Sequence, residues 1–137
     1  MGRFVMLVMT DANLGMEEEF NRFLDDVHIG DVLQADGLVS ARRFRLNDHQ
    51  PVFARGVPDL RYLTVYEIDC EDVRTVIESL ERHRETGRWR QSNTTAPTRI
   101  CAVYEQLPSV WAGTNPDESG DNTLPNAQLD EKARTAR

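Results

Sequence analysis

The sequence has few of the features that mark the common classes of enzyme and binding protein. It holds only two cysteines, Cys70 and Cys101, and neither belongs to a Cys-x-x-Cys motif. This usage argues against a disulfide framework and favours a reducing compartment. Basic residues are in deficit, because the formal net charge is -7. A nucleic-acid-binding scaffold needs a basic surface, so no nucleic-acid partner is expected.

Motifs for several reaction types are also missing. The chain has no Gly-x-Ser-x-Gly sequence, no glycine-rich phosphate loop and no dinucleotide fingerprint. These absences argue against serine hydrolases, kinases and dehydrogenases. The apolar run over residues 4–9 is too short to cross a membrane, and it lacks the basic start and cleavage site of a signal peptide. We therefore expect a cytoplasmic protein with no membrane partner.

The pattern of apolar residues predicts one α+β domain, residues 1–107, followed by a tail. Strands are predicted at residues 3–10, 38–46, 61–69 and 98–107, with helices after the first and third of them. The resulting β-α-β-β-α-β order is the ferredoxin-like pattern, with a four-stranded antiparallel sheet. Residues 108–137 are rich in Pro, Asn, Asp, Gly and Thr, so we expect an extended or disordered tail.

The first predicted helix, residues 17–33, carries a polar strip beside its apolar face. The apolar face follows from four residues at i, i+3, i+4 and i+7 spacing, Phe20, Phe23, Leu24 and Val27. Asn21, Asp25 and His28 fall along one edge of that face. A break is predicted near Gly30; if the helix continued beyond it, Asp31 would return to the apolar face. Ionisable groups at the margin of a core are where pKa values shift and pockets form.

Residues 19–33 and 37–44 together resemble the EthD-like branch of the dimeric α/β-barrel superfamily. The resemblance covers about residues 3–107 and includes a His-x-x-Asp pair, His28 and Asp31, with Gly30 where a proline is often found. It implies a homodimer whose two sheets close into a barrel, with a cavity in each subunit between sheet and helices. The superfamily includes cofactor-free monooxygenases, polyketide cyclases, dehydratases, decarboxylases, lactone isomerases and haem-binding enzymes.

The residues and the resemblance together suggest acid–base chemistry on an aromatic or polyketide-like metabolite, as in a lyase, dehydratase, isomerase or cyclase. His28 is the candidate general acid or base, and Asp25 or Asp31 is expected to orient its ring. The candidates for contact with substrate are a helix amide, an arginine and three strand tyrosines: Asn21, Arg43, Tyr62, Tyr66 and Tyr104. A histidine at the edge of an apolar face is more commonly a packing residue.

Two other classes of function stay open. Asp25, His28 and Asp31 stand at i, i+3 and i+6, but they spread over about 120° of helix, which is wide for one metal ion. We therefore expect no metal and no organic cofactor, while a cofactor-free or haem-dependent monooxygenase is the alternative enzyme. A non-catalytic ligand-binding module would need the cavity but no oriented histidine–carboxylate pair.

Overall fold

The computed structural model describes residues 2–114 of the chain. Its contacts divide the chain after Gln106, and the first unit, Met1–Gln106, contains every helix and strand named here. The elements are β1 (Gly2–Thr10), α1 (Glu17–Phe23), the π-helical turn η1 (Leu24–His28), α2 (Ile29–Val32), β2 (Leu38–Arg45), β3 (Tyr62–Cys70), α3 (Val73–Glu85) and β4 (Ile100–Glu105). The predicted β-α-β-β-α-β order is confirmed. Residues 115–137 of the predicted tail lie outside the described residues.

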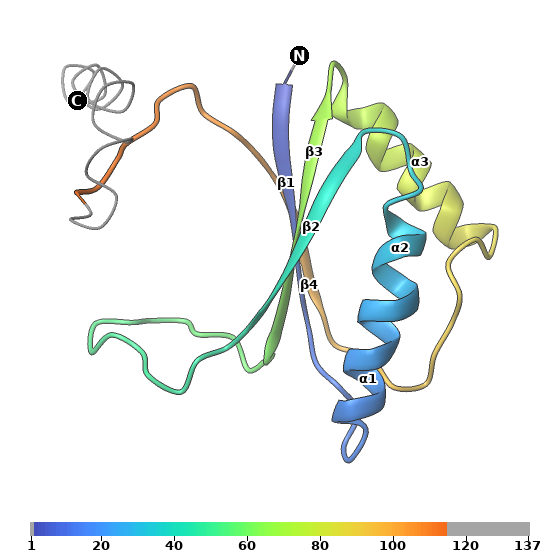
Figure 1. Ribbon diagram of the computed structural model, residues 1–137, viewed down its shortest axis with the longest axis vertical. Helices are drawn as coiled ribbons and strands as arrows, with labels where there is room; N and C mark the ends of the chain where they lie inside the picture. Colours follow the sequence, from blue (N-terminus) through green and yellow to red (C-terminus); the bar gives the residue numbers. More distant parts are fainter. Residues whose placement is uncertain (1, 115–137) are drawn as a thin grey trace. The chain divides into compact units, whose positions relative to one another are not determined.

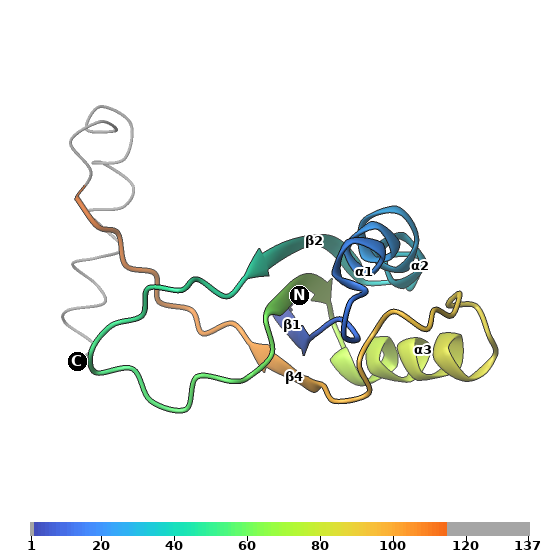
Figure 2. The ribbon, with the colours of Figure 1, turned by 90° about the horizontal axis from the view of Figure 1, so that it is seen from below.

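The four strands form one antiparallel sheet in the order β2-β3-β1-β4. The helices cover one side of this sheet (Figures 1 and 2). Met6 of β1 pairs with Tyr66 of β3 and with Val103 of β4, so these three side chains share the side that faces the helices. This arrangement is the ferredoxin-like fold, as the sequence predicted.

The core forms between that side of the sheet and the helices. Residues on β3 alternate between the two sides of the sheet, and Tyr62, Tyr66 and Ile68 are buried along one face of the strand. Val76 and Leu80, one helical turn apart, provide the buried face of α3. Burying an aliphatic or aromatic side chain of this size stabilises a fold by about 1.5–3 kcal/mol. This packing holds the helices at a fixed place over the sheet.

The helix after β1 runs without a break from Glu17 to Val32, so the break predicted near Gly30 is wrong. Its irregularity is the π-helical turn η1, which ends at His28. Beyond Gly30, Asp31 is only 3% exposed, and Arg90 binds its carboxylate. That contact holds the last turn of the helix in place. Turns of this kind occur often at functional sites.

A tight turn at Gly37 connects this helix to β2. Gly37 has a φ of 93°, a conformation that residues with a Cβ rarely adopt. A Cβ there would also lie 2.7 Å from Cγ2 of Val76 on α3. Glycine therefore allows the start of β2 to lie close against α3.

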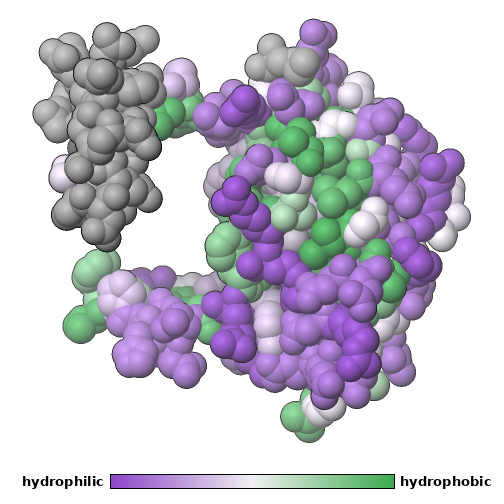
Figure 3. Space-filling model, viewed as in Figure 1, coloured by the Kyte–Doolittle hydropathy of each residue, from purple (hydrophilic) through white to green (hydrophobic). Residues whose placement is uncertain are grey.

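The side of the sheet away from the helices is uncovered within residues 2–106 and mainly apolar, and it also carries Arg3, Arg42 and Glu67. Its apolar side chains come from all four strands: Val5, Leu7, Met9, Phe44, Leu63, Val65, Ile100, Ala102 and Tyr104. The long loop between β2 and β3 projects on this same side (Figures 1 and 2). Its Val52 and Phe53 are 99% and 82% exposed, and apolar surface stands at the outer end of the loop (Figure 3).

Within residues 2–114, no helix has the length and apolar character needed to span a membrane.

A candidate active site between the sheet and the helices

A cavity of about 430 Å³ lies between the helix-facing side of the sheet and the helices. Strands β1, β3 and β4 form one wall, the helix from α1 to α2 and helix α3 form the other, and the loop after α3 contributes a third side. Apolar side chains make up much of the lining: Met6, Val8, Phe23, Leu24, Val32, Ile77, Leu80, Trp89 and Val103. A largely apolar pocket with a few polar groups is typical of a site for a small molecule.

His28, at the end of the π-helical turn, lines this cavity. Its ring stacks on Phe23, with centroids 5.8 Å apart, and meets the edge of Trp89 at the same centroid distance. Among residues 2–114, its ring makes no hydrogen bond. Burial lowers the pKa of His28; the charge of Asp31 raises it to a smaller extent and that of Arg99 lowers it. The imidazole is therefore neutral at pH 7 and free to accept a proton.

The Asp31 carboxylate, three residues later, is bound by Arg90. It accepts hydrogen bonds from the Arg90 backbone N–H at 2.9 Å, from Nε at 3.1 Å and from Nη2 at 2.7 Å. These bonds lower the pKa of Asp31 to about 2. Asp31 therefore acts on His28 through its charge and not through a hydrogen bond. By holding Arg90, it also fixes the loop in which the neighbouring Trp89 contacts His28.

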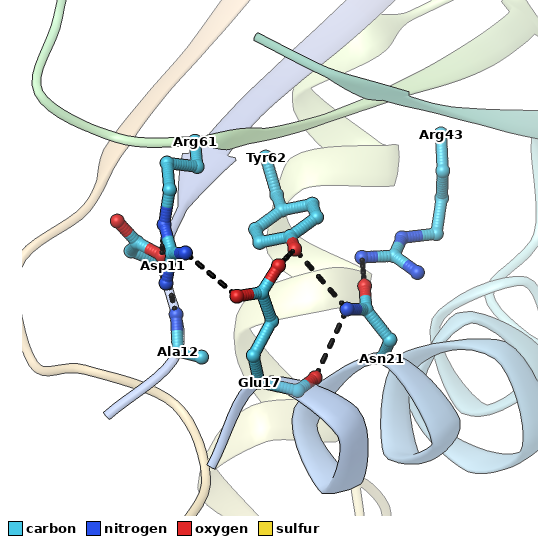
Figure 4. A network of polar contacts seen from close by, with 7 residues as sticks. All are labelled: Asp11, Ala12, Glu17, Asn21, Arg43, Arg61 and Tyr62. Carbon is cyan, nitrogen blue, oxygen red and sulfur yellow. Dashed lines mark hydrogen bonds and ion pairs between the residues drawn. The ribbon is translucent and has the colours of Figure 1, made fainter. Parts of the chain in front are cut away.

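Asp25, the other carboxylate expected to orient His28, pairs with Arg43 of β2 instead, at 2.9 Å. Arg43 also donates to Oδ1 of Asn21 at 2.8 Å, and Nδ2 of Asn21 donates to the hydroxyl of Tyr62 at 3.2 Å (Figure 4). None of these four residues lines the cavity. The structure therefore does not bring Asp25 to His28, and it does not bring Asn21, Arg43 and Tyr62 to this cavity. The polar strip of the helix meets β2 and β3 here, where those strands supply partners for it.

This polar network holds α1 against the sheet. Arg61 bridges Asp11 and Glu17 at 2.8 and 2.7 Å, and the Tyr62 hydroxyl donates to the same Glu17 carboxylate (Figure 4). The hydrogen bond from Tyr62 lowers the pKa of Glu17 most, and the one from Arg61 lowers it further. The Arg43 guanidinium also lies over the Tyr62 ring, 5.4 Å from its centroid. The side chains of this network bond one another, while Nε of Arg43 is buried without a hydrogen-bond partner among the described residues.

The three predicted tyrosines occupy three different environments. Tyr62 belongs to the polar network, whereas Tyr66 lines the cavity and is 2% exposed. Among the described residues, the Tyr66 hydroxyl has no hydrogen-bond partner, and burial raises its pKa. Tyr66 is thus a neutral donor available to a ligand. Tyr104 is 59% exposed on the opposite side of the sheet, so the structure does not bring it to this cavity.

The sequence reasoning missed several residues of the cavity. These are an aromatic residue, three arginines and a thiol, namely Trp89, Arg84, Arg90, Arg99 and Cys101. Each comes from α3, β4 or the loop between them, and no local motif marks them. Only the pairing of β4 with β1 and the contact of Arg90 with Asp31 bring them near His28.

The described part of the chain contains no group of three or more His, Cys, Asp or Glu side chains that could hold a metal ion. His28 and Asp31 are near each other, but Asp25 points to Arg43. The three side chains at i, i+3 and i+6 therefore do not form a ligand set.

Comparison with known proteins supports the fold alone. No protein-family model and no curated protein matches the sequence. The structure is similar to the crystal structure of a Dabb-family protein with a ferredoxin-like fold from Mesorhizobium loti, with a TM-score of 0.53 and 15% sequence identity. The match covers 78% of this chain and 99% of that one.

Proposed function

We propose that the cavity is the active site of a cofactor-independent enzyme in which His28 acts as general acid and base. The substrate is a small aromatic or polyketide-like metabolite, and the reaction is that of a lyase, dehydratase, isomerase or cyclase, as in EthD-like proteins. One observation carries the proposal: a half-buried imidazole, neutral and without a hydrogen bond, stands in the wall of a largely apolar cavity. A packing histidine would be expected to bond a protein acceptor.

The chemistry follows from the groups that reach the cavity. His28 takes a proton from an activated C–H bond, and the electron pair of that bond moves to the carbonyl oxygen to form an enolate. The Tyr66 hydroxyl donates a hydrogen bond to that oxygen. The imidazolium then returns its proton at another position of the substrate. The apolar lining strengthens both interactions, because charges and dipoles interact more strongly beside a low-dielectric wall than in water.

An assay for proton transfer tests this proposal without knowledge of the natural substrate. Enolisable ketones, lactones and phenols are incubated with the full-length protein in D₂O, and loss of C–H signals is followed by proton NMR. We expect exchange faster than in buffer for at least one of these classes. Exchange at the buffer rate throughout, at millimolar compound, would contradict acid–base chemistry here. Consumption of oxygen during the exchange would indicate that the enzyme is instead a cofactor-free oxygenase.

We further propose that two copies of this chain pair through the open sides of their sheets. All four strands contribute apolar side chains to that side, and the loop carrying Val52 and Phe53 projects beyond it. A contiguous apolar surface of this kind is typical of an interface between copies. Native mass spectrometry should give the mass of two chains, and a monomer at micromolar concentration would contradict the pairing.

The two free thiols favour a cytoplasmic location.

A further inference from the structure

We infer that the molecule bound in this cavity carries a carboxylate, which Arg84 of α3 and Arg99 at the start of β4 hold. The inference rests on the proposed function for the claim that this molecule is a substrate. Binding itself is separate from turnover and is tested separately.

The charges around the cavity have a positive excess. Its charged lining residues, apart from His28, are Glu81, Arg84, Arg90 and Arg99. Asp31 already neutralises Arg90, and Glu81 offsets one further positive charge. The chain as a whole carries a net charge of -7, so a cationic wall is unlike its average surface. A local excess of one sign in a concave site concentrates ligands of the opposite sign.

The two remaining arginines act on the interior of the cavity. Within residues 2–114, the side chains of Arg84 and Arg99 form no ion pair or hydrogen bond, and both residues are exposed to solvent. Burial raises the pKa of the Cys101 thiol on β4, while the charges of Arg99 and Arg84 lower it. Arg99 also lowers the pKa of His28. The positive charges of both arginines therefore act on the Cys101 thiol of β4. The charge of Arg99 also acts on the His28 imidazole across the cavity.

The surroundings select a monoanion with an apolar body. Guanidinium groups bind carboxylates through paired, charge-assisted hydrogen bonds. Glu81 lies on the same wall as Arg84, and its charge opposes a dianion such as a phosphate more strongly than a carboxylate. Aliphatic and aromatic side chains line most of the remaining surface, so the rest of the molecule is a ring or a hydrocarbon.

The Cys101 thiol lines the cavity and is therefore a built-in reporter of occupancy. The test measures its alkylation by iodoacetamide, resolved from that of Cys70 by peptide mass spectrometry, with 2-naphthoate or the neutral 2-naphthamide present. We expect naphthoate to slow alkylation of Cys101 at concentrations where naphthamide does not, with Cys70 unaffected. For each protein, the alkylation rate of Cys101 with ligand is divided by its rate without ligand, and these ratios are compared between wild type and variants. The ratio is needed because removing an arginine also changes the reactivity of the thiol.

Arg84→Gln and Arg99→Gln should each raise the half-protecting naphthoate concentration by about tenfold. Arg82→Gln removes the same charge from a residue of α3 that does not line the cavity, and it should leave this concentration unchanged. Thermal unfolding of each variant checks that the fold persists. Three results would overturn the inference. Naphthamide could protect Cys101 as well as naphthoate does, or phenyl phosphate could protect it better. Naphthoate could also protect Cys101 fully in the variant that combines Arg84→Gln and Arg99→Gln. Naphthoate protection without any C–H exchange would support the anion site and contradict the proposed function instead.

Discussion

Replacement of His28 by alanine is expected to lower the protein-catalysed rate of C–H exchange by about 10²–10⁴-fold, the usual contribution of a positioned general base. Among the described residues, no other base in the cavity is both neutral and free of a partner. The ring contacts with Phe23 and Trp89 are worth about 0.5–1.5 kcal/mol each, so the fold should survive their loss. Exchange rates in D₂O, with circular dichroism of the variant, measure both effects.

A matched control and a rescue experiment separate catalysis from structure. His49 lies exposed in the loop after β2, so His49→Ala should exchange substrate at the wild-type rate. Added imidazole should restore part of the activity of His28→Ala, because the alanine leaves space for a free base beside the substrate. A His28→Ala protein that kept most of its activity would remove this residue from the mechanism.

Tyr66→Phe is expected to slow the same exchange by about 10²–10³-fold, the effect of removing one donor from a developing oxyanion. The Tyr66 hydroxyl bonds no group within residues 2–114, so its removal should cost little free energy of unfolding. Loss of rate without loss of stability distinguishes a donor to substrate from a structural hydroxyl. The variant is measured by the exchange assay together with its thermal unfolding temperature.

Tyr104→Phe provides the matched control, since the same atom is removed from the opposite side of the sheet. Its exchange rate should equal that of the wild type. An unchanged rate in Tyr66→Phe would show that the oxyanion does not form at this hydroxyl. A loss of stability equal to the loss of a bonded hydroxyl, about 1 kcal/mol, would show that Tyr66 has a protein partner.

The fold was predictable because its signals are local and repeated. Alternation along β3 places Tyr62 and Tyr66 on the buried face, and each residue confirms the register of the next. The prediction of a helix break at Gly30 was wrong because a residue distant in the sequence stabilises the helix there. Glycine costs a helix about 1 kcal/mol, but Asp31 in the following position is held by Arg90, which lies 59 residues away. No local pattern contains that contact.

The candidate site was predictable only in part. His28 and Tyr66 do reach the cavity, because each lies on a face that the hydrophobic pattern defines. Asp25 does not join them: the π-helical turn alters the angles of a regular helix, and Arg43 on β2 captures its carboxylate. The arginines Arg84 and Arg99 come from separate elements, and only the packing of α3 and β4 brings them to one cavity.

The central claim, that His28 is a neutral base inside the cavity, is tested most directly by its titration in the intact protein. The three histidines can be assigned in NMR spectra by comparison with His28→Ala. Because burial is the largest influence, His28 should keep its neutral form down to a pH below the ordinary histidine pKa of about 6.5. The exchange rate should fall over the same pH range, as protonation removes the base. Titration at or above the ordinary value would show that burial does not favour the neutral ring, which would contradict this claim.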